Sequence, residues 1–486
     1  MLLSVAAYCL AFPPWNVSVA AWVALAPLLL ALHGGGTLAA AATGFLWGVL
    51  VLWGIGYWVA GGLALYWQQP YWLALLFALG IAVVYMGEYF ALFSVAYRRI
   101  RARWSPTAVP WVVAALYVTC EFARERLLTG HPWLLLGYAL VPHVMFVQIA
   151  DVGGVYVLSF VLALTSAALV EAIVHRDRRP LVGALAAIAA VALYGTFRLS
   201  VPLPREPEVP VMVVQGNVDV GSQWRRDLYG EGLGQYLRLS ADRAAETHPR
   251  LIVWPESAVT FFLDEEPTYL GSITRVLRSH GADLVLGGPR RDGHDERFFN
   301  SAFYVTADGG VVGRYDKVHL LPFAEYFPLR TIHFLRREFG RIRYFTASDE
   351  PALLHTRFGD AATLICFEAI FPEVVRRQTT AGATFMLNLS NDAWFGAGAG
   401  ADQHLMMVAL RAVENRLWVV RGTTTGVSAI IDPYGRITER IPLFTPGTID
   451  GRIVPMSVST PYKTCGDAFA WLCVLVTLAG LLRPRR

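Results

Sequence analysis

The chain has 486 residues, more than one ordinary domain needs, and 55% of them are hydrophobic while 16% are charged. Soluble domains carry about 25% charged residues, so this composition and the mean hydropathy of +0.44 predict a membrane protein. The formal net charge of +4 is small and gives no reason to expect a nucleic-acid partner. The five cysteines lack the spacing of a disulfide framework or a zinc site.

Long apolar stretches dominate the N-terminal part of the chain. Each approaches the ~20 residues that a membrane-spanning helix needs. We therefore predict a membrane domain over 1–200 with seven transmembrane helices, and residues 465–486 as an eighth transmembrane helix with a basic cytoplasmic tail. The predicted spans are 1–13, 16–33, 38–60, 71–97, 107–125, 154–174, 180–199 and 469–482.

Three clusters of arginine orient these predicted spans. They follow the fourth span, separate the sixth from the seventh, and follow the eighth. With the N-terminus inside, all three clusters fall on the cytoplasmic side, as the positive-inside rule expects. The segment 201–464 then lies outside the cytoplasm. The clusters are Arg98, Arg99, Arg101 and Arg103; Arg176, Arg178 and Arg179; and Arg483, Arg485 and Arg486.

The segment 201–464 has a different character from the apolar parts that flank it. Short β-rich runs alternate with more polar helical stretches, which is typical of a layered α/β domain. Strands are expected at 209–215, 251–254, 284–287, 302–305, 311–315, 361–365, 385–389, 418–422 and 427–431, and helices at about 228–246, 266–280, 371–381 and 401–416.

Three residues with complementary chemistry follow apolar runs in this segment. They are Glu256, Lys317 and Cys366. A carboxylate that takes a proton, an ammonium that stabilises negative charge and a thiol that attacks a carbonyl are the parts of covalent acyl transfer. Taken one at a time, each residue also has a structural interpretation, as a helix cap, a surface charge or a buried thiol.

The segments around these three residues resemble the Glu-Lys-Cys signature of the nitrilase superfamily. In chain order they are Trp254–Ala258, Tyr315–Phe323 and Ile365–Glu368. The resemblance implies a four-layer α-β-β-α sandwich. It also implies that Glu256 is the general base, that Lys317 stabilises the tetrahedral intermediate, and that Cys366 carries a thioester.

With the membrane part included, the chain resembles the apolipoprotein N-acyltransferase family of the bacterial cytoplasmic membrane. Ala324 and Phe367 depart from the glycine and tyrosine that are frequent in this family. Phe367 lacks a hydroxyl, so a hydrogen bond made by that group in relatives has no counterpart here. The matching segments are Ala11–Trp15, Glu121–Phe122, Thr129–Trp133, Gly137–Tyr138, Val214–Asn217, Pro322–Pro328, Ser390–Gly396 and Gln403–His404.

Four further residues are candidates for binding substrate or supporting the site. The resemblance implies a supporting or substrate-amine role for Glu325. Glu368 stands two residues from Cys366 and is expected to bond backbone groups beside it. Trp224 and Trp394 have two interpretations, as packing residues or as aromatic boundaries of an acyl chain.

No metal or cofactor is expected. The spacing and loop context of His131, His319 and His404 do not give a metal-ligand set. The loops 324–329 and 394–400 carry aromatic side chains and are candidates for a mobile lid.

The expected reaction is a ping-pong acyl transfer. In it, Cys366 takes an acyl chain from a membrane phospholipid, and the N-terminal α-amine of a diacylglyceryl-cysteine apolipoprotein then accepts it. The resemblance implies a bacterial inner membrane with the catalytic domain on the periplasmic side. Nothing in the sequence requires more than a monomer.

Two other functions are compatible with parts of the sequence. A membrane-tethered amidase or nitrilase would use the same three residues and release its acyl group to water. A transporter or lipid-binding protein with an inactive outer domain is less compatible, because charged residues are scarce inside the predicted spans. Glu88, in the fourth span, is one exception.

Overall fold

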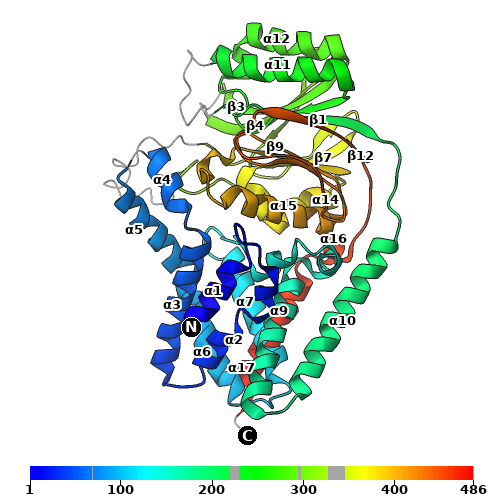
Figure 1. The fold of residues 1–486 in the computed structure, drawn as a ribbon. Helices are drawn as coiled ribbons and strands as arrows, with labels where there is room; N and C mark the ends of the chain where they lie inside the picture. The colour runs from blue at the N-terminus through cyan, green and yellow to red at the C-terminus, as the bar shows by residue number, and fades with distance from the viewer. Residues whose placement is uncertain (68, 219–228, 294–296, 327–344, 485–486) are drawn as a thin grey trace.

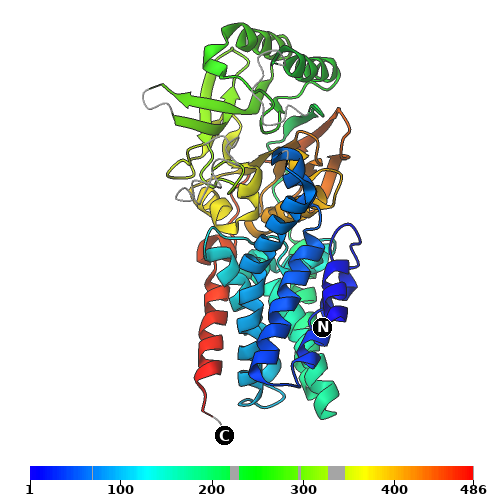
Figure 2. The same cartoon turned by 90° about the vertical axis from the view of Figure 1, so that its left-hand side faces the viewer.

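Two six-stranded sheets lie face to face in the middle part of the chain, above a bundle of helices (Figure 1). The computed structural model describes all residues except 68, 219–228, 294–296, 327–344 and 485–486. The helical bundle is formed by the N-terminal part of the chain together with the C-terminal helix (Figure 2).

The strand order of the first sheet is β12-β1-β2-β3-β4-β5, and that of the second is β11-β10-β9-β8-β7-β6. Strands β1 to β3 run parallel, as do β7 to β9, while the remaining pairs are antiparallel. The first sheet contains β1 (Val209–Gln215), β2 (Leu251–Val253), β3 (Asp283–Asp292), β4 (Arg297–Val305), β5 (Val311–Asp316) and β12 (Gly447–Ile453). The second contains β6 (Leu354–Thr356), β7 (Gly359–Ile365), β8 (Phe385–Ser390), β9 (Val419–Thr423), β10 (Ser428–Ile431) and β11 (Ile437–Ile441).

Two helices cover the outer face of each sheet. They are α11 (Tyr229–Thr247) and α12 (Pro267–His280) on the first sheet, and α14 (Pro372–Thr380) and α15 (Gly400–Asn415) on the second. The layers therefore run α-β-β-α, which confirms the predicted nitrilase-like sandwich. The short segments η5 (Leu263–Glu265), η6 (Cys366–Ile370) and η7 (Asp392–Phe395) connect these elements.

Strand β1 illustrates why the sheets are buried on both faces. Val211 and Val213 pack between the two sheets, whereas Met212 and Val214 pack under α11 and α12. Side chains alternate across a strand, so a continuous apolar run supplies both cores at once. All nine predicted strands overlap observed ones, and so do the four predicted helices of this segment.

The helical bundle is built from elements of very different length. It contains α1 (Leu2–Leu10), η1 (Ser18–Val23), α2 (Ala26–Ala31), α3 (Thr37–Ile55), α4 (Val59–Trp67), α5 (Tyr71–Ala82), η2 (Val83–Gly87), α6 (Glu88–Arg101), α7 (Val109–Arg126), η3 (Leu136–Leu140), α8 (Val144–Val147), α9 (Ala150–His175), α10 (Arg179–Ser200), α16 (Pro461–Cys465) and α17 (Ala468–Leu482).

Four helical stretches among the described residues are long and apolar enough to cross a membrane. They are Thr37–Ile55, Tyr71–Arg101, Ala150–His175 and Arg179–Ser200, and they coincide with the third, fourth, sixth and seventh predicted spans. The predicted first, second and eighth spans fall on shorter apolar helices, and the fifth falls on α7, which ends in charged residues. The chain is therefore a membrane protein, while the total of eight spans and the domain boundaries stay predictions.

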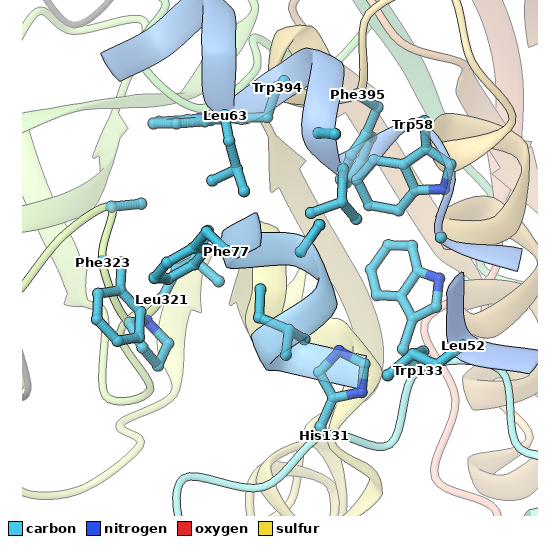
Figure 3. Close-up of a pocket in the computed structure, with 18 of the residues that line it drawn as sticks. Leu52, Trp58, Leu63, Phe77, His131, Trp133, Leu321, Phe323, Trp394 and Phe395 are labelled. Atoms are coloured by element: carbon cyan, nitrogen blue, oxygen red, sulfur yellow. The ribbon is translucent and has the colours of Figure 1, made fainter. Parts of the chain in front are cut away.

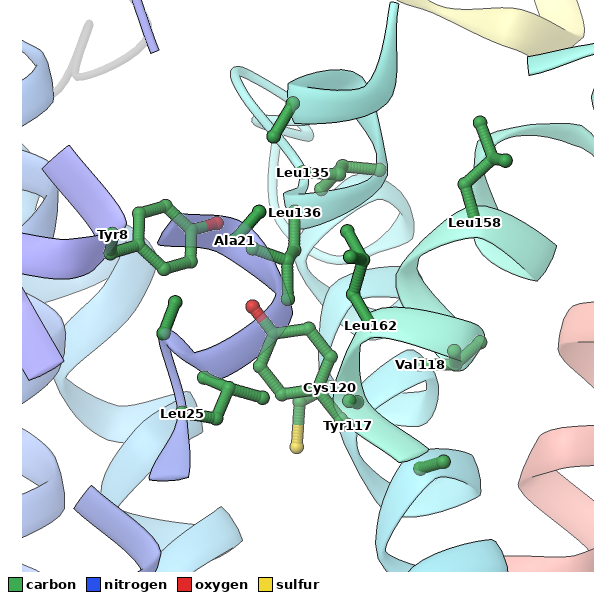
Figure 4. Close-up of a cluster of buried hydrophobic side chains, with 14 of the residues drawn as sticks. Tyr8, Ala21, Leu25, Tyr117, Val118, Cys120, Leu135, Leu136, Leu158 and Leu162 are labelled. Atoms are coloured by element: carbon green, nitrogen blue, oxygen red, sulfur yellow. The ribbon is translucent and has the colours of Figure 1, made fainter. Parts of the chain in front are cut away.

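The core of the bundle joins the short N-terminal helix α1 to the long helices α7 and α9. Figure 4 shows Tyr8 of α1 and Leu25 beside Tyr117 of α7 and Leu162 of α9, all of them buried. The Tyr8 hydroxyl donates to the Leu134 carbonyl at 3.0 Å. The N-terminal helix is thereby fixed against the rest of the bundle.

Candidate active site

The three predicted site residues converge at one edge of the sandwich. Glu256 follows β2 and Lys317 follows β5 in the first sheet, while Cys366 follows β7 in the second. All three side chains are buried, with exposures of 6%, 1% and 7%. The Lys317 ammonium nitrogen lies 3.6 Å from Glu256 Oε1, and both charges act on the Cys366 thiol. A carboxylate, an ammonium and a thiol therefore share one buried site.

Cys366 stands on a sharp turn between β7 and η6. Its φ is +52°, in the left-handed region that non-glycine residues seldom adopt. Two other residues near the site also have positive φ. They are Ser257, next to Glu256, at +55°, and Phe323, in the loop after Lys317, at +65°. Such strain persists only where the surroundings determine the backbone, and it is frequent at active sites.

Glu368 helps to hold the backbone at Cys366 in this strained conformation. One of its carboxylate oxygens accepts the Ile365 N–H at 2.7 Å, and the other accepts the N–H groups of Val318 and His319 at 2.7 and 3.1 Å. The Tyr315 hydroxyl donates to the same oxygen at 2.9 Å. Glu368 thus joins the turn at the thiol to the loop that carries the lysine, and it bonds the backbone groups that the sequence led us to expect.

The carboxylates of Glu256 and Glu325 both contact the Lys317 ammonium and the Asn300 side-chain amide. Lys317 Nζ donates to Glu325 Oε1 at 3.0 Å and lies 2.9 Å from its other oxygen. Asn300 Nδ2 donates to Glu256 Oε1 and to Glu325 Oε1, both at 2.7 Å. The Asn391 N–H donates to the second oxygen of Glu256 at 2.7 Å. These bonds hold Glu256 in one orientation.

The electrostatics of the site favour a protonated thiol at rest. Burial raises the pKa of Cys366, and the Glu256 carboxylate raises it further, while Lys317 opposes both. Burial also raises the pKa of Glu256, against the effect of Lys317. Burial alone would lower the pKa of Lys317, but the carboxylates of Glu325 and Glu256 outweigh it, so the ammonium stays charged. A cation therefore faces a thiol and a carboxylate that compete for one proton.

An apolar cavity of about 340 Å³ opens beside Cys366. Its lining comes from both parts of the molecule, with Leu52 and Leu63 from the helical bundle and Phe367 from the sandwich. Figure 3 shows two aromatic groups on either side of it. Trp58, Trp133 and Phe395 form one, and Phe77 and Phe323 form the other.

A buried polar network lies close to Cys366. Asp392 accepts from Arg421 Nη2 at 2.5 Å and from the Ser390 hydroxyl at 2.6 Å, and His404 Nδ1 lies 3.2 Å from its Oδ1. Burial alone would raise the pKa of Asp392, but Arg421 and His404 hold it at about 2. His404 and Cys366 line the same cavity.

The other predicted site residues differ in where they lie and what they contact. Glu325 contacts the lysine, Glu368 supports the turn, and Trp394 lines the cavity. Trp224 lies outside the described residues, as does the second half of the predicted lid loop 324–329, from residue 327 on. In the described part of the chain, no three His, Cys, Asp or Glu side chains are grouped as a metal site.

The sequence offered no reason to place Asn300 or His404 in the site, and it predicted Asp392 to be a turn residue. Asn300 lies on β4, between the strands that precede Glu256 and Lys317, and no motif marks it. Asp392 and His404 belong to two of the matched segments, Ser390–Gly396 and Gln403–His404. The order of these segments was therefore a signal that could have identified them.

Two protein families match successive parts of the chain. The apolipoprotein N-acyltransferase N-terminal domain matches residues 4–168, and the carbon-nitrogen hydrolase family matches residues 213–461. Together they cover most of the helical bundle, without α10 and α17, and nearly all of the sandwich.

Relatives named apolipoprotein N-acyltransferase match over most of the chain. The one from Geobacter metallireducens is 36% identical, over 96% of this chain and 91% of the relative. The one from Azotobacter vinelandii is 36% identical, over 80% and 76%, and the one from Vibrio vulnificus is 30% identical, over 98% and 95%. Among solved structures, a Nesterenkonia amidase of the nitrilase superfamily is 19% identical with a TM-score of 0.43, over 56% of this chain and 98% of that one.

Proposed function

Because this chain belongs to the apolipoprotein N-acyltransferase family, we propose that it works through a thioester on Cys366. It is a membrane-bound acyltransferase that N-acylates lipoproteins with an acyl chain from phospholipid. The observation that carries the mechanism is the cavity, which places a buried thiol against side chains of the helical bundle.

In the first half-reaction the thiol attacks the ester carbonyl of a phospholipid. Glu256 takes the thiol proton as the sulfur–carbon bond forms, and it returns that proton to the alkoxide oxygen as the ester bond breaks. Lysophospholipid leaves and the acyl group stays on Cys366. The raised pKa of Glu256 suits both steps, since a weak base in water becomes a stronger one when buried.

Negative charge develops on the carbonyl oxygen in each tetrahedral intermediate. The Lys317 ammonium and the backbone N–H of Phe367 are the donors that we assign to it. Glu325 and Asn300 keep the ammonium and the base apart and oriented, through the bonds at 2.7 to 3.0 Å described above. A preorganised cation needs no reorientation when the charge appears.

In the second half-reaction the α-amine of the diacylglyceryl-cysteine attacks the thioester. Glu256 accepts the amine proton and passes it to the departing sulfur, so the amide forms as the thiol is restored. The site lies within one chain, which supports a monomer as the working unit. No metal or cofactor takes part in these steps.

The distribution of arginines supports a periplasmic catalytic domain. Arg103 of one cluster donates to the Leu481 carbonyl at 2.9 Å, near the cluster that follows α17. Arg101 lies 3.5 Å from Glu171, close to the cluster that follows α9. The described members of the three clusters thus gather at the end of the bundle away from the sandwich (Figure 2), which suits a cytoplasmic face in the bacterial inner membrane.

The cavity also favours transfer to an amine over transfer to water. A thioester survives only where water is excluded, and the lining is largely apolar. A hydrolase that used the same three residues would need water at the thioester. It would have no use for helices of the bundle in the lining of its site.

The test supplies the purified full-length protein with phospholipid vesicles and a diacylated lipopeptide that begins with diacylglyceryl-cysteine. We expect triacylated peptide and lysophospholipid in equal amounts, detected by mass spectrometry. An otherwise identical peptide with an acetylated α-amine serves as the control and should stay unchanged. Release of free fatty acid at the same rate with either peptide would favour the hydrolase instead.

A further inference from the structure

Gln403 of α15 ties the catalytic domain to the helical bundle through all of its side-chain hydrogen-bonding groups. Its Oε1 accepts the indole N–H of Trp58 at 3.0 Å and that of Trp133 at 2.9 Å. Its Nε2 donates to the carbonyls of Pro13 and Ile55 at 3.1 and 2.9 Å. The side chain is fully buried.

The chemistry of the partners fixes the orientation of this amide. Indole nitrogens only donate and backbone carbonyls only accept. The oxygen of Gln403 therefore faces Trp58 and Trp133, and its nitrogen faces Pro13 and Ile55. A rotated amide would lose all four bonds in a buried place, so the two indoles are held in defined positions.

The two indoles and Phe395 form one side of the cavity that contains Cys366 (Figure 3). The ring centroids of Trp58 and Trp133 are 5.3 Å apart, and those of Trp58 and Phe395 are 4.8 Å apart. Phe395 completes the group at 5.6 Å from Trp133. We refer to Trp58, Trp133 and Phe395 as the aromatic wall.

The side chains of the aromatic wall are closely packed and have little space to move. A Cβ atom added at Gly398 would lie 2.6 Å from the Cβ of Trp58, so the backbone before α15 packs directly against that residue. Next to Trp133, the ring of His404 lies at a centroid distance of 6.0 Å, and His404 in turn contacts Asp392. The wall is therefore supported by Gly398 and His404 of the catalytic domain as well as by Gln403 of the same domain.

We propose that the aromatic wall sets the length of the acyl chain that Cys366 accepts, with Gln403 as the positioning residue that keeps the wall in place. This rests on the proposed function, because the chain in question is the one carried as a thioester. In a fixed apolar site, each methylene that fits or fails to fit changes the preference roughly fourfold. If the aromatic wall could move, the preference between acyl chains of different length would be smaller.

The experiment measures which acyl chain is attached to Cys366. The full-length protein is incubated, without acceptor, with an equimolar mixture of phosphatidylethanolamines that differ only in acyl-chain length. Mass spectrometry of the intact protein then gives the distribution of adducts. For the wild type we expect one preferred length, with the chain two methylenes longer disfavoured by about tenfold or more.

Two variants alter the wall and its support. Trp133→Ala opens space and should shift the preferred chain to a longer one. Gln403→Met keeps a similar volume but removes all four bonds, and it should reduce the ratio between the preferred and longer chains by about fourfold or more. Should Gln403→Met fail to accumulate, the double variant Trp58→Phe and Trp133→Phe removes the same indole donors and decides the question.

Trp47→Phe is the matched control. Trp47 is also a buried tryptophan of the bundle, and its indole donates to the Ser4 hydroxyl at 2.8 Å, but it does not line the cavity. Its adduct distribution should equal that of the wild type. An unchanged distribution in Trp133→Ala and in the Gln403 or double-phenylalanine variant would overturn the inference alone. Absence of any adduct on an active wild type would overturn the proposed thioester and the inference with it.

Discussion

At the scale of single residues, the site is a small set of buried charges arranged around one thiol. The sequence identified Glu256, Lys317 and Cys366 because each follows a recognisable strand and belongs to a specific segment. It did not identify Asn300, whose role depends on the pairing of β4 with its neighbours. A neutral amide carries no chemical signature until the fold places it between two carboxylates.

Asn300→Leu tests the role of that amide through the pH dependence of the reaction. In the proposed mechanism Glu256 acts as a base only when ionised. Burial already raises its pKa, and the Asn300 N–H stabilises the ionised form. Removing that donor should raise the pKa further and move the acid limb of kcat/KM to higher pH. A hydrogen bond to a carboxylate contributes about 1.5 kcal/mol, so the expected shift is about one pH unit.

The measurement is kcat/KM of the wild type and of Asn300→Leu from acidic to neutral pH with the same lipopeptide. It gives the acid limb of the pH profile for each protein. A limb that stays in place or moves to lower pH would show that Asn300 does not stabilise the ionised base.

At the scale of elements, the turn between β7 and η6 places the thiol, and Glu368 holds that turn. Predicting the turn was possible because an apolar run ends at Cys366. The strands at the ends of the two sheets were harder to predict. Strand β11 has no apolar run and β12 contains two glycines, so both become strands only because β10 and β1 pair with them.

The end of α3 is a second case in which packing overrode the sequence. The apolar run 38–60 predicts one continuous span, yet α3 ends at Ile55 and α4 begins at Val59. Between them, the Ile55 carbonyl and the Trp58 indole both bond Gln403 of the catalytic domain. A contact across hundreds of residues cannot be read from local hydropathy.

Glu368→Gln tests the support of the turn. The amide offers one acceptor oxygen where the carboxylate offers two, so at least one side of the link between Ile365 and Val318 is lost. Displacing a nucleophile by about 1 Å costs on the order of 10²-fold in rate. We expect a loss of this size in kcat, measured as triacylated peptide formed at saturating substrate.

The matched control is Glu373→Gln, on the neighbouring helix α14. Its carboxylate pairs with Arg376 and Arg377 near the surface, away from the thiol. Its activity should stay close to wild type. Equal losses in both variants would mean that Glu368 acts only through general stability.

At the scale of the whole molecule, the catalytic domain is bound to the bundle by buried ionic contacts as well as by Gln403. Arg416, at the end of α15, donates to Asp151 of α9 at 2.7 Å, and both side chains are fully buried. Asp151 also lies 2.8 Å from Arg198. A tethered hydrolase would need no such joint, and this contact could not be predicted because its partners are far apart in sequence.

Arg416→Met tests the joint. Removing one partner leaves the Asp151 carboxylate buried with fewer donors, which costs about 3–5 kcal/mol in other proteins. We expect a clear fall in the midpoint of thermal unfolding, measured on the full-length protein in detergent. Arg452→Met is the control, because Arg452 pairs with Glu208 at the surface and an exposed pair contributes about 1 kcal/mol or less. Similar midpoints for the two variants would contradict a structural role for the buried joint.

The mass of the intact protein after incubation with one defined phospholipid, without acceptor, tests the thioester on Cys366 most directly. We expect the mass of a single acyl group on Cys366, lost when the diacylated lipopeptide is added and absent from Cys366→Ala. An active wild type that never carries this mass, or a Cys366→Ala variant that still forms triacylated peptide, would contradict it.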